Sequence, residues 1–469
     1  MSTKQTIAQL QSTDRDNVFH PSTHASDHAH GKLPVNIIQS GNGIYIKNQQ
    51  GTELLDAFAG LYCVNVGYGR TEIADAIYEQ AKKLAYYHTY VGHSNEAIIK
   101  LSQRIIDWAP DGMRKVYYGL SGSDANETQI KLVRYYQNIL GNKSKKKIIS
   151  RDRGYHGSSI AAGSLTGLNL FHQAFDLPID GILHTLAPHF YWNAEDGMSE
   201  TEFSQHCADE LEKMILAEGP ETVGAFIGEP VMGTGGLIPP PEGYWDAVQK
   251  VLRKYEVLLI ADEVVCGFGR VGAPFGSHLY DIRPDLITIA KGLTSAYLPL
   301  SGVIVGERVW EVIERGSEEL GPMGHGWTYS GHPIAAAAAL ANLDILEREK
   351  LTENARDTGS YLQEQFKKSF ENHPLVGEVR GVGLLAALEF VADKSKKQSF
   401  DSNWKVGAKV SAACLEQNLI ARAMPNGDIL GFAPPLSITR KEVDDVVKRT
   451  TKALNSVADL LTKEYSWKG

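Results

Sequence analysis

The chain has 469 residues, of which 43% are hydrophobic and 22% charged, and its formal net charge at pH 7 is −9. This length exceeds what one hydrophobic core usually supports, so we expect two structural domains. The negative charge gives no support to a nucleic-acid partner, and no apolar run reaches the roughly 18 residues that a membrane span needs.

The amino-terminal segment carries no targeting signal that we can identify, because it begins Met1-Ser2-Thr3-Lys4 and lacks the apolar core of a signal peptide. The cysteines are far apart and have no metal-type spacing, which is typical of reduced thiols in a cytoplasmic protein. They are Cys63, Cys207, Cys266 and Cys414. The histidines of the segment are His20, His24, His28 and His30. No cysteine or carboxylate pattern accompanies them, so we expect no metal site.

Between residues 95 and 330, short apolar strands alternate with amphipathic helices. This alternation predicts an α/β fold with a mostly parallel sheet covered by helices on both faces. The expected strands are residues 115–119, 147–150, 225–229, 257–262, 286–290 and 302–306, and the expected helices include 123–140, 201–217 and 243–255.

The carboxyl-terminal third has a different pattern, in which helices surround an apolar pair of strands at 377–389. The expected helices here are 355–370, 404–417 and 441–461. This is an α+β module, and we expect the start of the chain to pack with it. The predicted division is a large domain at 71–329 and a small domain built from 1–70 and 330–469.

Two glycine patterns match a dinucleotide fingerprint only formally. Residues 267–272 read GFGRVG, but the following residues do not begin a helix, and 381–386 read GVGLLA within an expected strand. The fingerprint requires a strand before it and a helix at its third glycine. We therefore expect no dinucleotide site, and no P-loop motif is present.

Ser121-Gly122-Ser123 is a better phosphate site, because it follows an expected strand and opens an expected helix. Free N–H groups at a helix amino terminus, two hydroxyls and a glycine suit a dianionic phosphate. The alternative is simple capping of the helix, with Ser123 as the expected N-cap.

Asp262 and Lys291 each end an apolar strand, and ligands of open α/β sheets bind at these carboxyl ends. A lysine there can form a Schiff base with an aldehyde, and an aspartate can pair with a protonated pyridine nitrogen. Either residue alone could be an ordinary charged strand end. However, Glu229 ends a third strand, and Tyr155-His156-Gly157 follows a fourth and offers an aromatic face. The convergence favours one site.

These motifs together resemble those of the class III aminotransferases, which are fold-type I enzymes that use pyridoxal phosphate. The resemblance covers nearly the whole chain. It rests on Ser121 to Asn126, Tyr155 to Gly157, Ile260 to Val264, Ala290 to Gly292 and Thr328 to Pro333, and residues 57–69 and 422–425 resemble the ω-transaminase branch.

The resemblance implies a role for each matching residue. Lys291 would hold the cofactor as a Schiff base and shuttle the proton, while Asp262 would keep the pyridine nitrogen protonated. Tyr155 and Val264 would lie on the two ring faces, with Glu229 near the ring hydroxyl and His156 also at the cofactor. Ser121, Gly122, Ser123 and the partner subunit's Thr328 would bind phosphate. Tyr62 and Thr234 would line the substrate pocket, and Arg422 would bind a substrate carboxylate.

The implied enzyme is a homodimer, with a tetramer as the alternative, that moves an amino group from a primary amine or ω-amino acid to pyruvate and so forms alanine. The alternatives are 2-oxoglutarate as acceptor, an aminomutase or a decarboxylase. A cofactor-binding regulator is disfavoured, because no helix-turn-helix or basic domain is present. Relatives often differ at Ser22, Tyr62, Asp152 and Thr234, so a preference for bulky arylalkylamines does not carry over.

Overall fold

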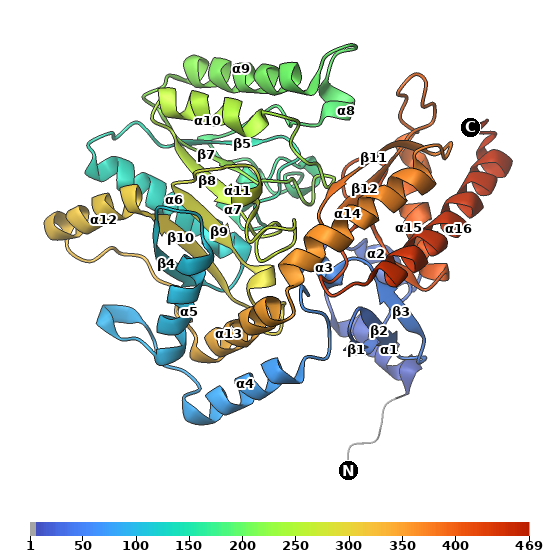
Figure 1. Ribbon diagram of the computed structural model, residues 1–469, viewed down its shortest axis with the longest axis horizontal. Helices are drawn as coiled ribbons and strands as arrows, with labels where there is room; N and C mark the ends of the chain where they lie inside the picture. The colour runs from blue at the N-terminus through green and yellow to red at the C-terminus, as the bar shows by residue number, and fades with distance from the viewer. Residues whose placement is uncertain (1–5, 469) are drawn as a thin grey trace.

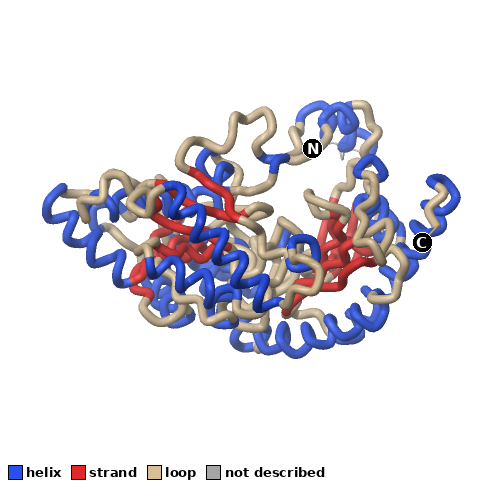
Figure 2. Tube along the Cα trace, turned by 90° about the horizontal axis from the view of Figure 1, so that it is seen from above, coloured by secondary structure: helices blue, strands red, loops and turns tan. Residues whose placement is uncertain are grey.

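The computed structural model describes residues 6–468, so the expectations for Met1 to Lys4 and for residue 469 lie outside the described residues. The chain forms two lobes, each with its own strands (Figures 1 and 2). Within residues 6–468, no helix is both long and apolar enough to cross a membrane.

The larger lobe is built on a seven-stranded sheet. Its strands, in spatial order, are β4 (Met113–Gly119), β10 (Ser301–Gly306), β9 (Leu286–Ile289), β8 (Leu258–Asp262), β7 (Val223–Gly228), β5 (Lys147–Arg151) and β6 (Ile182–Thr185). Strand β10 runs antiparallel to both of its neighbours, and all the other pairs are parallel. The predicted mostly parallel sheet is confirmed. The sequence prediction missed β6, a short edge strand.

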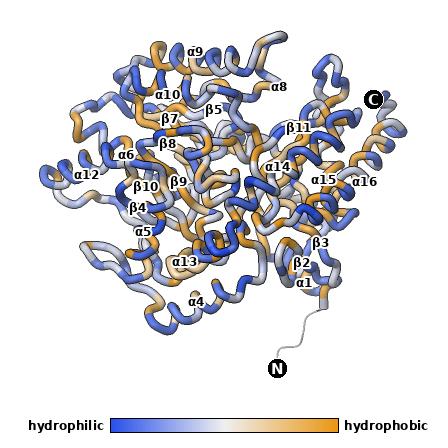
Figure 3. The backbone as a smooth tube through the Cα atoms, in the orientation of Figure 1, coloured by the Kyte–Doolittle hydropathy of each residue, from blue (hydrophilic) through white to orange (hydrophobic). Residues whose placement is uncertain are grey.

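Helices cover both faces of this sheet (Figure 1). Helices α6 (Gly122–Ile139) and α12 (Glu307–Leu320) pack on one face, and α9 (Glu200–Glu218) and α10 (Tyr244–Lys254) pack on the other. Strand β8 contributes to both cores, because Leu258 and Ile260 face α6 while Leu259 faces α10. Hydrophobic segments accordingly concentrate along β7, β8 and β9, inside the lobe (Figure 3).

The smaller lobe combines both ends of the chain. Strand β3 (Glu53–Asp56) pairs in parallel with β13 (Leu419–Ile420), which joins β1 (Ile38–Asn42) and β2 (Tyr45–Asn48) to the carboxyl-terminal part. A second sheet has the order β11-β12-β15-β14. Its strands are β11 (Val376–Val382), β12 (Leu385–Phe390), β14 (Arg422–Ala423) and β15 (Ile429–Phe432), and the helices here are α14 (Leu351–Phe370), α15 (Val406–Glu416) and α16 (Arg440–Tyr465).

The pair of strands expected at 377–389 is confirmed as the antiparallel pair β11 and β12. The glycine pattern at 381–386 was expected within one strand, and this is wrong, because the pattern crosses the turn between β11 and β12. The remaining helices include α1 (Ile7–Asn17), α2 (Ala25–Ala29), α3 (Ala59–Tyr62), α4 (Thr71–Lys83), α5 (Glu96–Trp108), α7 (Ile160–Leu165), α8 (Phe190–Asn193), α11 (Gly276–Leu279) and α13 (Pro333–Arg348).

Candidate active site

The carboxyl ends of β7, β8 and β9 meet the start of α6 at a cavity of about 120 Å³. It is lined by Gly122, Ser123, Asn126, Tyr155, His156, Gly157, Glu229, Asp262, Val264, Val265, Ala290 and Lys291. All of the predicted cofactor residues except Ser121 and Thr328 are in this set. The structure therefore brings together residues that come from five separate stretches of the sequence.

A larger hollow of about 590 Å³ lies at the opposite edge of the same sheet, where Asp246, Asp285 and Arg308 line it. Asp285 directly precedes β9, so this hollow is at the amino end of the parallel strands. Ligands of open α/β sheets bind at the carboxyl ends. We therefore take the smaller cavity as the candidate active site.

Asp262 is buried at the end of β8 and held by three groups. Its Oδ2 accepts a hydrogen bond from Asn126 Nδ2 at 2.9 Å and lies 2.8 Å from His156 Nδ1. Its Oδ1 accepts from the Val264 N–H at 3.2 Å. A carboxylate with fixed donors on both oxygens keeps its position at the cavity.

Asn126 and Thr288 were missed by the prediction of site residues. The Asn126 side chain donates to the His156 carbonyl at 2.7 Å as well as to Asp262, and its Oδ1 accepts from Thr288 Oγ1 at 2.7 Å. Both residues are fully buried. The available signal was the polar character of Asn126 on the buried face of a helix, since a buried amide must be hydrogen-bonded.

Lys291 follows β9 and has a φ of 45°, which is uncommon for a residue with a side chain. Such strain concentrates at functional sites. Burial lowers the pKa of its ammonium group, and the charge of Arg422 acts in the same direction. Its Nζ lies 5.2 Å from the ring centroid of Tyr62. A lysine with a lowered pKa is a better nucleophile and proton carrier near neutral pH.

The amino terminus of α6 corrects one expectation: the N-cap is Ser121 and not Ser123. Ser121 Oγ accepts from the Asp124 N–H at 3.2 Å, and Asp124 accepts in return from the Ser121 N–H at 3.0 Å. This capping box leaves Ser123 Oγ beside the cavity, where it accepts from the Ser158 N–H at 3.1 Å. The capping hydroxyl of Ser121 is therefore turned to the helix, and the hydroxyl at the cavity is that of Ser123.

Glu229 is buried beside the cavity and organises two loops. Its Oε1 accepts from the Tyr155 N–H at 3.1 Å, and its Oε2 accepts from the Gly233 N–H at 2.7 Å. Burial raises the pKa of this carboxyl group. The Tyr155 ring lies at the cavity with the ring of Phe171 5.3 Å away in an edge-on arrangement. Glu229 thus connects the aromatic residue to the loop that carries Thr234.

The predicted substrate residues come from three separate elements. Tyr62, in α3, is 1% exposed, and its hydroxyl contacts Met424 Sδ at 3.8 Å. Thr234 is buried in the loop after β7. The guanidinium of Arg422, in β14, lies 5.7 Å from the Phe58 ring centroid. No carboxylate of residues 6–468 forms an ion pair with Arg422, which removes the simplest structural role for it.

Three further residues lie away from the cavity lining. Thr328 is exposed, and its carbonyl accepts a hydrogen bond from the Tyr86 hydroxyl. Asp152 is exposed as a residue, but partial burial of its carboxyl group raises the pKa of that group. Ser22 lies in the turn before α2. Within residues 6–468 Thr328 thus lies outside the cavity lining, and its expected phosphate contact from a partner subunit stays a prediction.

Two arginines that were not predicted hold the Thr234 loop. Arg153 Nε donates to the Gly235 carbonyl at 2.9 Å, and Arg380 Nη2 donates to the Gly236 carbonyl at 2.7 Å. Arg380 also forms ion pairs with Glu378 at 2.6 Å and Glu389 at 2.8 Å. Because Arg380 and Glu389 belong to β11 and β12, the smaller lobe positions a loop of the larger one.

The family model of "Aminotransferase class-III" matches residues 25–454 of this chain. The chain is a class III aminotransferase. The aminotransferase is 66% identical to the diaminobutyrate–2-oxoglutarate transaminase of Halomonas elongata, over 96% of this chain and 97% of that protein. It is 45% identical to the putrescine–pyruvate aminotransferase of Pseudomonas aeruginosa, over 90% and 91% of the two chains.

Solved structures agree with this assignment. The ω-transaminase of Pseudomonas jessenii in complex with PMP superposes on the aminotransferase with a TM-score of 0.94, at 43% identity, and covers 97% of this chain and 99% of that one. The predicted fold class and the predicted cofactor, pyridoxal phosphate, are thereby confirmed.

The residues of the cavity fit pyridoxal phosphate. A fixed buried carboxylate (Asp262) and a lysine with a lowered pKa (Lys291) face the same space as the amino terminus of α6. Gly122 belongs to this fit, because a Cβ there would come within 3.3 Å of Val264 Cγ2, one of the cavity residues. When bound, the cofactor supplies an electrophilic carbon and an electron-accepting ring.

Proposed function

We propose that the aminotransferase moves an amino group from a primary amine or an ω-amino acid to pyruvate, which becomes alanine. The observation that carries the proposal is the position of Arg422 over Phe58, 5.7 Å from the ring centroid, without a carboxylate partner among residues 6–468. A guanidinium in this state can bind the carboxylate of pyruvate and be left free when the donor has none.

Each group of the site has a proposed task. Lys291 Nζ takes and returns the proton during transfer, and its lowered pKa supports this. Asp262 holds the proton of the pyridine nitrogen, and Asn126 and His156 hold Asp262. Gly122 and Ser123 bind the phosphate, while Ser121, whose hydroxyl and N–H are used in the capping box, orients this end of α6. Tyr155 and Val264 flank the ring, and Glu229 lies at its edge. Tyr62 and Thr234 shape the space for the donor.

The proposal includes a homodimer. An exposed apolar surface surrounds Thr328, and monomeric proteins rarely expose such a patch without a partner. It comprises Tyr86, Tyr87, Tyr90, Val91 and Tyr329, of which Val91 is 90% exposed. The rings of Tyr86 and Tyr329 lie 5.7 Å apart, and the Tyr86 hydroxyl donates to the Thr328 carbonyl, so these two rings lie beside Thr328. A second copy seated on the patch would deliver Thr328 to the phosphate site of its partner.

A second acceptor, 2-oxoglutarate, is favoured by one observation: the relative that is 66% identical is named for it. This relative and the putrescine–pyruvate relative are named for different acceptors. Both are named for a donor that carries two amino groups. Diamines and diamino acids are therefore the first donors to test.

The test pairs each donor with each acceptor. Putrescine, 2,4-diaminobutyrate, β-alanine and 1-phenylethylamine are incubated with pyruvate or 2-oxoglutarate, and alanine and glutamate are quantified by chromatography. We expect alanine from pyruvate to form faster with the best donor. Faster formation of glutamate would transfer the proposal to 2-oxoglutarate, and formation of neither product with any donor would overturn both.

A further inference from the structure

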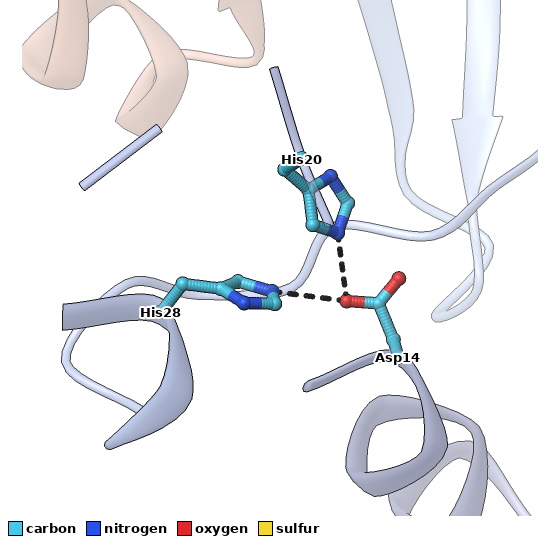
Figure 4. A group of neighbouring side chains, drawn as sticks. All are labelled: Asp14, His20 and His28. Carbon is cyan, nitrogen blue, oxygen red and sulfur yellow. Dashed lines mark hydrogen bonds and ion pairs between the residues drawn. The ribbon is translucent and has the colours of Figure 1, made fainter. Parts of the chain in front are cut away.

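A second cluster of ligating side chains lies in the amino-terminal segment, on α1, α2 and the loop that joins them (Figure 4). His20 Nε2 lies 2.9 Å from Asp14 Oδ1, and His28 Nε2 lies 3.0 Å from the same oxygen. The ring centroids of the two histidines are 4.6 Å apart. No metal was expected here, because no carboxylate pattern accompanies the histidines in the sequence. The carboxylate is that of Asp14 in α1, six residues before His20.

We propose that Asp14, His20 and His28 form a binding site for a divalent cation of the zinc type. Two imidazoles and one carboxylate are ligands that zinc and its neighbours among the transition metals prefer. One ligand atom from each residue lies within 4.8 Å of the others. Neutral imidazoles must present a lone pair, so each ring would carry its proton on Nδ1 when the cation is bound.

The spacing of the ligand atoms suits a metal. Two ligands at the usual zinc distance of about 2.0–2.1 Å are roughly 2.9 Å apart when they subtend about 90° at the ion, and a few tenths of an ångström further apart in a tetrahedron. The observed separations of 2.9 and 3.0 Å match the first case. A cation can therefore replace the two N–H donors with only small movements of the side chains.

The site is half enclosed and leaves room for a further ligand. His28 is 8% exposed, while His20 and His28 both line a cavity of about 280 Å³ together with Thr23. Three protein ligands with an open position are the usual arrangement of a zinc ion that also binds water or an exogenous ligand.

The neighbouring histidines provide matched controls, because they are bound elsewhere. His24 Nδ1 pairs with Asp27, and His30 Nδ1 contacts the Ser26 carbonyl. A second set of three possible ligands, His189, Glu378 and Glu389, does not qualify. There Arg380 Nη1 already lies between the two carboxylates and neutralises them.

The test uses full-length holoenzyme without an affinity tag. ZnCl₂ is titrated by calorimetry, bound metal is counted by mass spectrometry after dialysis, and CoCl₂ is added for its visible absorption. We expect about one ion per chain, and the affinity to fall more than about 100-fold in Asp14→Asn, His20→Ala and His28→Ala, since losing even an outer-shell partner costs about 10- to 100-fold. His24→Ala and His30→Ala should bind as the unaltered protein does.

Two outcomes would overturn the proposal. One is no zinc bound at micromolar concentration, which would make the cluster a hydrogen-bonded clasp only. The other is binding that survives in both Asp14→Asn and His20→Ala, which would place the metal elsewhere. Because His28 is buried, its variant also needs a melting curve, whereas the half-buried His20, whose side chain is 36% exposed, allows a test with less loss of packing. Zinc should further slow cleavage by trypsin after Arg15, which lies between two ligands in the sequence.

Discussion

The two sides of the active-site cavity are built in different ways. On the cofactor side, Asp262, Asn126, His156 and Thr288 form one buried hydrogen-bonded network on adjacent strands and α6. On the substrate side, Tyr62, Thr234 and Arg422 come from separate elements. Within residues 6–468, the only hydrogen bond made by any of these three side chains is a long one from the Tyr62 hydroxyl to Met424 Sδ.

This difference indicates that the cofactor side of the cavity must be rigid, while the substrate side must be able to move. A fixed charge beside a cofactor contributes to the rate only if it does not reorganise during reaction. A substrate pocket that admits both an amine and an oxo acid needs side chains that can move. The substrate side is positioned indirectly, through backbone carbonyls held by Arg153 and Arg380.

The largest expected loss of activity concerns Lys291, which lies between the cofactor side and the substrate side. Lys291→Ala should reduce turnover by about 10⁴-fold or more, because both the covalent attachment and the proton carrier are lost. Borohydride reduction of the holoenzyme followed by peptide mapping should place the cofactor on Lys291. The exposed Lys100 serves as control, and Lys100→Ala should retain activity. A cofactor adduct on any other lysine contradicts the assignment.

Asp262→Asn should slow the half-reaction with amine donor by about 10²- to 10⁴-fold while the cofactor stays bound, since a preorganised electrostatic interaction is removed. Stopped-flow absorbance measures this directly. The adjacent Glu263 is a matched control, because it is also buried but is held by Gly276 and Ser277 instead of by the network around Asp262. Equal rate losses in Glu263→Gln would show that the effect is loss of packing and not of charge.

Glu389 tests whether the smaller lobe supports the substrate side. Burial alone would raise the pKa of this carboxyl, but the positive charge of Arg380, together with His189 and the hydrogen bond from Trp192, outweighs burial and lowers the pKa from 4.5 to about 2. A carboxyl group whose pKa is lower in the folded than in the unfolded protein stabilises the folded state at pH values above its unfolded pKa. This stabilisation is lost as the pH falls toward the folded-state pKa of about 2.

Glu389→Gln should therefore lower the free energy of unfolding at pH 6 by on the order of 3 kcal/mol, and the difference should shrink as pH falls below about 4.5. Urea unfolding at several pH values checks the slope. Glu364, which is exposed, supplies the control variant Glu364→Gln. A difference that does not change with pH would refute an ion-pair origin.

Arg422→Ala should raise the KM for pyruvate by about 10- to 100-fold, the value of one or two charge-assisted hydrogen bonds, and leave single-turnover reaction with a simple amine nearly unchanged. Arg440 is a fair control because its guanidinium also stacks on an aromatic ring, 5.1 Å from Tyr361, away from the cavity. If both half-reactions fall together, Arg422 holds the structure and the carboxylate receptor lies elsewhere.

The smallest effect concerns the donor profile. Tyr62→Trp combined with Thr234→Ala should shift the ratio of kcat/KM toward arylalkylamines by about tenfold, since Thr234→Ala removes volume and a hydroxyl. Competition between 1-phenylethylamine and putrescine measures the ratio. Because Tyr62 is packed 4.4 Å from Phe58, a melting curve must accompany the variant. An unchanged ratio in a folded double variant would place both residues outside the pocket.

The sequence predicts those parts of the fold and site that depend on local patterns. Apolar strands that end on Asp262 and Lys291 identify the edge of the sheet where they meet. Asn126 and Arg380 escape such reasoning, because their partners lie 136 and 144 residues away along the chain. The same holds for the carboxylate of Asp14, which approaches His28 only through the turn between two short helices. The edge strand β6 is too short and too polar to stand out.

The unpaired state of Arg422 has an evolutionary consequence. Replacing a buried ion-paired residue leaves an uncompensated charge behind, and such changes are strongly selected against. Arg422 forms no ion pair within residues 6–468, so its replacement leaves no buried carboxylate without a partner. Under the proposed role, acceptor preference can drift in a lineage one substitution at a time, which makes the position the first to randomise when a new oxo acid is wanted.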